Sequence, residues 1–105
     1  MRKPKPPLDT AGLERLALYY VERFATTRAK LRSYLDRKIR ERGWEGAPAD
    51  TAALADRLAA LGYVDDAAFA AGRSAALHRR GFGARRVALA LRAAGIEIEA
   101  ADSEE

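Results

Sequence analysis

A glycine followed at once by a bulky apolar residue occurs four times, and this pair constrains the fold more than any other feature of the sequence. The pairs are Gly43-Trp44, Gly62-Tyr63, Gly81-Phe82 and Gly95-Ile96. Each pair follows a segment with helical spacing. Glycine adopts the left-handed conformation that ends a helix, and the next residue folds back as an apolar contact. We therefore expect these glycines to mark the ends of four short helices.

The expected starts of the first two helices agree with this pattern once caps and apolar spacing are considered. Apolar residues from Leu13 to Phe24 form one stripe and predict a first helix over 10–24. Thr26 or Thr27 is expected to cap a second helix that ends at Arg42, with Leu31 and Leu35 on its apolar face.

Three more helices are expected after a loop at 44–49. Asp50 is placed to cap the third, and Asp65 to cap the fourth, with Phe69 stapled back onto Val64. The fourth runs to Arg80, and Gly83 opens the fifth. The residues expected to face the core here are Leu54, Leu58, Leu61, Phe69, Leu77, Val87, Leu91 and Ala94.

The order of elements is duplicated, because a helix, a short turn and a basic helix occur twice. This predicts an all-α fold of tandem three-helix repeats, with about five helices in an elongated array. Residues 1–8 are expected to be a disordered basic tail and 97–105 an acidic tail. Between them, 9–62 would form the first repeat and 63–96 the second, of which two helices are clear.

Several classes of function find no support in the composition. The chain has no cysteine, which excludes disulfides and thiolate sites. Its single histidine, His78, is expected at a helix end, and the Asp65-Asp66 pair at a helix start, where capping explains it. We expect no catalytic site, no metal, no cofactor, no membrane span and a cytoplasmic location.

Positive charge is the feature that points to a partner. Residues 97–105 carry five acids and no base, so the rest of the chain holds all 19 Lys and Arg against ten acids. No acid lies between Asp66 and Glu97. Such a body suits nucleic acid or an acidic protein surface, although surface helices can carry arginine without a partner. The candidate binding residues are Arg79, Arg80, Arg85, Arg86 and Arg92, with Arg28, Arg32, Arg37 and Arg40 as a second face.

The run from Leu61 to Ile96 resembles the RecX family, regulators of the bacterial RecA recombinase. The resemblance lies in three stretches, which are LGYVDDAAFA at 61–70, RRGFGARRV at 79–87 and LRAAGI at 91–96. Residues 27–35 and the stop at 42–44 are similar to the family's first unit. The sequence departs from the family pattern at Ala84, where proline is frequent, in a longer second helix, and in the lack of a third unit.

The resemblance implies tandem three-helix repeats and a specific activity. The protein would lie in the groove of the RecA–single-stranded DNA filament and inhibit ATP hydrolysis, strand exchange and co-protease activity, thereby modulating DNA recombination, DNA repair and the SOS response. Arg79, Arg80, Arg85 and Arg86 would face the filament.

Two alternatives stay open at this point. One is a non-specific helical module that binds single- or double-stranded DNA through its arginine-rich helices, with steep dependence on salt. The other is an adaptor for an acidic protein. Exposed aromatic rings for stacking on bases are not expected, because Tyr19, Tyr20, Tyr34 and Trp44 have spacings typical of a core. A monomer is expected.

Overall fold

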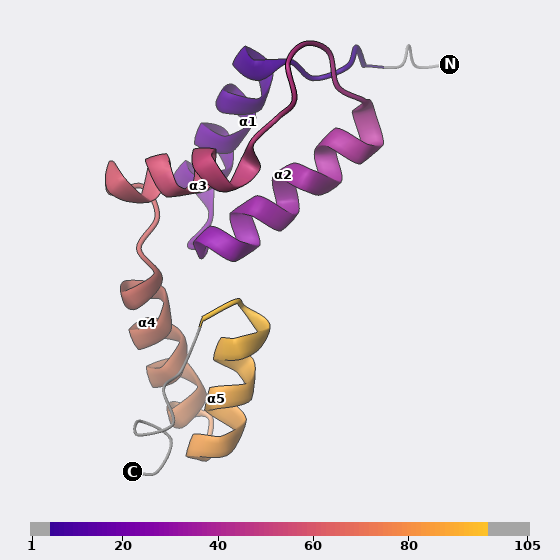
Figure 1. Cartoon of the computed structure of the whole chain (residues 1–105). Helices are drawn as coiled ribbons and strands as arrows, with labels where there is room; N and C mark the ends of the chain where they lie inside the picture. The colour runs from indigo at the N-terminus through magenta and orange to yellow at the C-terminus, as the bar shows by residue number, and fades with distance from the viewer. Residues whose placement is uncertain (1–4, 97–105) are drawn as a thin grey trace.

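Five α-helices follow one another in the computed structural model, which describes residues 5–96. They are α1 (Thr10–Arg23), α2 (Arg28–Arg42), α3 (Thr51–Ala60), α4 (Asp66–Arg79) and α5 (Ala84–Ala93) (Figure 1). Residues 5–96 contain no β-strand. The all-α class predicted from the glycine pattern is therefore confirmed.

Side-chain caps start four of these helices. Thr27, Asp50 and Asp65 accept hydrogen bonds from backbone N–H groups three residues later, at 3.1, 2.9 and 2.9 Å, as predicted. Asp9 caps α1 in the same way, because its side chain accepts a 2.8 Å hydrogen bond from the N–H of Gly12. These bonds satisfy N–H groups that have no partner within the helix. Helix α5 differs, because it begins after Gly83 and has no side-chain cap.

The four predicted stop glycines all have positive φ, between 85° and 91°. After α3, α4 and α5, the residue following the glycine donates its N–H to the carbonyl five residues back, and the glycine donates to a carbonyl three residues back. This pattern is the Schellman motif. One bond of each pair runs from Tyr63 to Leu58, from Phe82 to Leu77 and from Ile96 to Leu91.

The stop after α2 is built differently and orders part of the predicted N-terminal tail. Gly43 sends the chain into an extended segment, and Trp44 forms a parallel bridge with Leu8. The backbone N–H of Leu8 donates a 2.9 Å hydrogen bond to the carbonyl of Gly43, and Leu8 is only 2% exposed. The expectation of disorder over residues 1–8 is therefore wrong at Leu8, since one buried leucine anchors this segment; residues 1–4 lie outside the described range.

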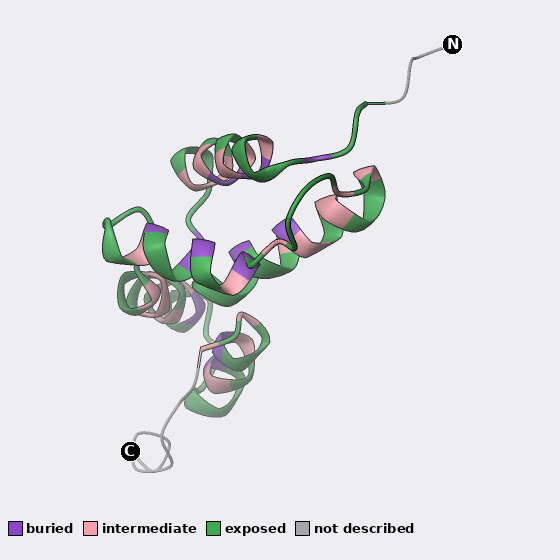
Figure 2. Ribbon diagram, turned by 45° about the horizontal axis from the view of Figure 1, so that its top comes forward, coloured by how far each residue is buried: buried purple, intermediate pink, exposed green. Residues whose placement is uncertain are grey.

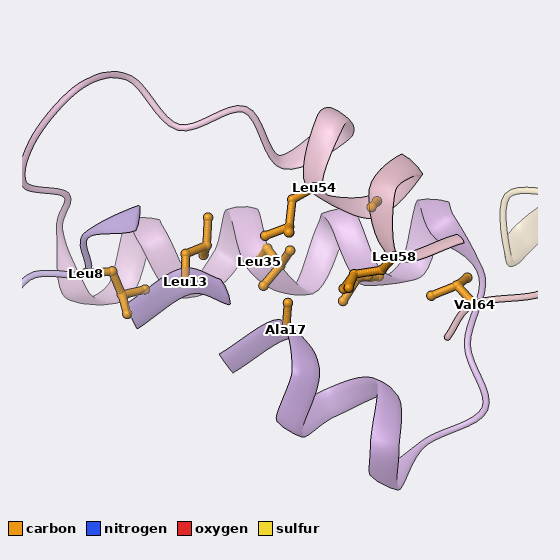
Figure 3. Packing of buried hydrophobic residues seen from close by; sticks show 9 residues of the cluster. Leu8, Leu13, Ala17, Leu35, Leu54, Leu58 and Val64 are labelled. Carbon is orange, nitrogen blue, oxygen red and sulfur yellow. The ribbon is translucent and has the colours of Figure 1, made fainter. Parts of the chain in front are cut away.

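The main core lies between α1, α2 and α3 (Figure 2). Leucines from all three helices point toward one another there, with Leu8 and Val64 at its two ends (Figure 3). Leu31 and Leu35 on α2 are fully buried. Leu61 does not join them. It is 66% exposed, which corrects its predicted place in the core, because it is the C-cap residue beyond the last residue of α3, one position before the turn at Gly62.

Helices α4 and α5 form a second, smaller core and extend the molecule. Leu77, Val87 and Leu91 are buried there, with Phe82 and Ile96 packed against them. Phe69, predicted as core, belongs to neither cluster and is only half-buried, because its ring lines an open hollow and is approached by the Lys30 ammonium, 5.3 Å from the ring centroid. The principal extents are 51 × 33 × 20 Å, and the radius of gyration is 16.4 Å, against about 13 Å for a compact domain of this length.

The first turn of α2 joins the two cores. The Thr27 hydroxyl donates a 2.6 Å hydrogen bond to the carbonyl of Ala94, at the end of α5. The backbone N–H of Arg28 donates to the carboxylate of Asp66, at the start of α4, over 2.9 Å. Gly95 lies so close to Ala29 that a Cβ on it would stand 2.2 Å from the Ala29 Cβ. The α4–α5 pair is thus held by its two ends.

Candidate functional site

The nine arginines predicted to bind a partner fall into three groups in the structure. The first group surrounds the turn from α4 to α5 and consists of Arg79, Arg80, Arg85 and Arg86. We call this turn the arginine turn. Arg28, Arg32 and Arg40 lie on the part of α2 that carries or faces acidic side chains. Arg37 and Arg92 line an open groove. The structure therefore does not join the second predicted face into one uniform basic surface.

The arginine turn is organised around Phe82. The guanidinium carbons of Arg80 and Arg86 lie 5.2 and 4.6 Å from the centroid of its ring, which is within cation–π range. His78 Nδ1 lies 3.1 Å from the carbonyl oxygen of Phe82. All four arginines are exposed. The turn therefore presents four cations to solvent, two of them held against one ring.

The positive charges in the first turn of α5 destabilise this helix. The N-terminus of a helix carries partial positive charge, and a basic residue there costs about 0.3–1 kcal/mol. Helix α5 has no acidic residue in its first turn and no side-chain cap, and that turn carries Arg85 and Arg86. An anion would satisfy the free N–H groups and the guanidinium groups together. The local chemistry suits a phosphate or a carboxylate.

Arg28 and Arg32 already have acidic partners within the chain. The guanidinium of Arg28 lies 3.3 Å from Asp56 and 3.6 Å from Asp66, while Arg32 lies 3.9 Å from Asp36. Arg40 shares a shallow groove with Asp36 and Trp44. Because carboxylates neutralise this part of α2, its arginines are weaker candidates for an anionic partner than the arginine turn.

An open groove of about 740 Å³ lies between α1, α2 and the C-terminal end of α5, and we call it the aromatic groove. It is lined by four aromatic residues, Tyr19, Tyr20, Phe24 and Tyr34, and by three cations, Lys30, Arg37 and Arg92. None of the acidic side chains in the described part of the chain lines it. Half of the eight aromatic residues in the chain thus meet at one basic hollow.

Sequence reasoning missed this groove because it assigned the aromatic rings to the core. Tyr19 and Phe24 are in fact 54% and 55% exposed, and Tyr20 and Tyr34 are half-buried. Both exposed rings lie toward the C-terminal end of α1, outside the core cluster that α1 forms with α2 and α3. The available signal was the crowding of three aromatic residues within six positions, 19–24, just before a strongly basic helix.

Residues 5–96 hold no cluster of three or more His, Asp or Glu side chains that could bind a metal ion. Within the same residues, no helix has the length and apolar character needed to cross a membrane. Comparison with protein-family models, with curated proteins and with solved structures finds no match to this chain.

Proposed function

We propose that this protein binds the filament that the RecA recombinase forms on single-stranded DNA and inhibits its ATP hydrolysis, strand exchange and co-protease activity. The observation that carries the proposal is the arginine turn. It displays four exposed arginines, two at the end of α4 and two at the start of α5, which has no side-chain cap, and it lies inside the stretch that resembles the RecX family.

The unfavourable placement of Arg85 and Arg86 supports a binding role. A first turn that favours helix stability is neutral or acidic, because the N-terminus of a helix carries partial positive charge. Two arginines there make sense if an anionic surface completes the site. A filament of protein and single-stranded DNA offers such a surface in phosphates and carboxylates.

The arrangement of helices supports the tandem repeats that the resemblance implies. We propose that α1–α3 form one three-helix repeat and α4–α5 the first two helices of another. In this proposal Thr27 and Gly83 are equivalent, since each is the N-cap of the second helix of its unit. An elongated molecule of 51 Å could span neighbouring protomers of a filament.

The test is to titrate the protein into RecA assembled on single-stranded DNA and to follow ATP hydrolysis, with binding to bare DNA measured in parallel. We expect hydrolysis to fall at substoichiometric protein, with weaker binding to bare DNA than to the filament. Unchanged hydrolysis together with tight, salt-dependent binding to bare DNA would favour the non-specific DNA-binding module instead.

Variants of single arginines locate the site. Arg86→Glu is expected to weaken inhibition, and Arg15→Glu, an equal change of charge on an exposed position of α1, serves as the matched control. If both variants inhibit like the original protein, the arginine turn is not the contact surface. If both lose inhibition equally, net charge rather than this site governs binding.

A further inference from the structure

The aromatic groove exposes ring surface that the fold does not use. More than half of Tyr19 and of Phe24 is open to solvent, and both line the same hollow. Leaving large rings in water forgoes the free energy that burial would provide, so adjacent exposed rings mark a surface that a partner covers.

The rings are held in place rather than scattered. Tyr20 stacks on Tyr34 with 4.2 Å between ring centroids and 25° between ring planes, which joins α1 to α2 across the groove. Phe24 lies 5.1 Å from Tyr20 on the same helix. Aromatic side chains have few rotatable bonds, so a partner that stacks on this group meets a surface that is already organised.

Cations accompany the rings. The guanidinium carbon of Arg23 lies 4.3 Å from the centroid of Tyr19, and that of Arg37 lies 5.5 Å from the centroid of Tyr34. Lys30 and Arg92 line the groove from α2 and α5. A guanidinium stacked on a ring extends the flat surface and adds positive charge to it.

Neighbouring hollows on the molecule lack this combination. The hollow that reaches from Phe24 to Phe69 includes Glu22 and Asp65, and the one beside Arg28 includes Asp56 and Asp66. Among residues 5–96, the charged residues that line the aromatic groove are all cations. Its occupant should therefore be negatively charged and should also carry flat faces that stack on the rings. Acidic peptides in general lack such flat faces.

We propose that the aromatic groove binds unpaired bases of single-stranded nucleic acid, with bases stacked on Tyr19 and Phe24 and phosphates near Lys30, Arg37 and Arg92. Stacking platforms beside cations are how proteins hold single strands without reading sequence. This inference goes beyond the proposed function, because it concerns a second surface and requires no recombinase.

The test measures the affinity of the free protein for fluorescent single strands of about twelve thymidines, in the usual range of site sizes. A strand of the same length without bases carries the same phosphates. We expect the thymidine strand to bind at least about five-fold more tightly than the abasic strand, because stacking contributes beyond charge. Equal affinities for the two strands would overturn the proposal.

Substitutions then assign the effect to the groove. Tyr19→Ala and Phe24→Ala should each weaken binding of the thymidine strand about five-fold or more and leave the abasic strand unaffected, while Tyr19→Phe should bind normally. Tyr63→Ala is the matched control, since Tyr63 is 48% exposed but lies outside the groove. If both alanine variants bind the thymidine strand as tightly as the original protein does, the bases bind elsewhere.

An acidic peptide tests the alternative occupant. If such a peptide binds as tightly as the thymidine strand and its affinity falls in the same variants, the groove binds peptides instead. Because no recombinase is present, these outcomes do not depend on the filament.

Discussion

The Thr27 hydroxyl serves two helices at once, because it accepts from the N–H of Lys30 at 3.1 Å and donates to the carbonyl of Ala94 at 2.6 Å. One buried side chain thus caps the start of α2 and satisfies the end of α5. The two ends meet head to tail, with the positive end of one helix dipole against the negative end of the other.

Thr27→Ala should lower the free energy of unfolding by about 1–3 kcal/mol, since it removes a helix cap and leaves the partly buried carbonyl of Ala94 with one partner fewer. Thr27→Ser keeps the hydroxyl and should recover most of the loss. Urea unfolding followed by circular dichroism measures both. Equal losses in the two variants would mean that the threonine methyl group, not the hydroxyl, matters at this junction.

Gly95→Ala should disturb the junction more than a comparable change elsewhere. Its Cβ would stand 2.2 Å from the Cβ of Ala29, whereas a Cβ on Gly81 would meet nothing within 4 Å. Both glycines have positive φ, so alanine costs about 1–2 kcal/mol at either position through the backbone alone. The excess loss in Gly95→Ala over Gly81→Ala, measured by thermal unfolding, reports the contact.

The double variant Ala29→Gly/Gly95→Ala provides an internal check. Removing the Ala29 methyl group opens space for the new one, so the two changes together should destabilise less than the sum of their separate effects. Strict additivity would argue that the two residues do not touch in solution.

Leu58 on α3 and Leu61, the C-cap residue three positions later, should differ strongly in their effect on stability. Leu58 is 4% exposed and Leu61 is 66% exposed. Leu58→Ala should cost about 2–5 kcal/mol, because it leaves a cavity between α1, α2 and α3. Leu61→Ala should change stability by less than about 0.5 kcal/mol. Urea unfolding of both proteins checks this, and similar losses would contradict the end of α3 seen here.

Charge reversal at two arginines should change stability with opposite signs. Arg85→Glu places a negative charge in the first turn of α5 and should stabilise the protein by about 0.3–1 kcal/mol, while Arg79→Glu, in the last turn of α4, should destabilise it by a similar amount. Thermal unfolding at low salt measures the difference, and added salt should shrink it. Loss of binding in Arg85→Glu could then not be attributed to unfolding.

Substitutions at Arg28 and Arg37 should affect single-strand binding differently, although both residues lie on α2. Arg28 is engaged with Asp56 and Asp66, whereas Arg37 lines the aromatic groove. Arg37→Ala should lower the salt dependence of single-strand binding by about one phosphate contact, and Arg28→Ala should leave it unchanged. Arg28→Ala should instead reduce stability by less than about 1 kcal/mol. If the affinity of both variants depends on salt concentration in the same way, α2 acts as one binding face.

Much of the local structure was contained in the sequence, because caps and stops act over a few residues. Thr27, Asp50 and Asp65 start helices through side-chain bonds to their own next turn, and Gly62, Gly81 and Gly95 end helices through their own backbone. Apolar spacing likewise predicted Leu31, Leu35 and Leu58 as core.

Only the tertiary structure decided which apolar faces are covered and which charges stand alone. Helical spacing places Phe24 and Leu61 on apolar stripes, but each is the C-cap residue of its helix and remains exposed, at 55% and 66%. The burial of Leu8 depends on a bridge to Trp44, which lies far away in sequence. Arg28 and Arg37 look equivalent along the chain, yet folding brings Asp56 and Asp66 to the first and places the second in the groove that the aromatic rings of α1 line. Contacts between distant segments set these differences, and no local pattern encodes them.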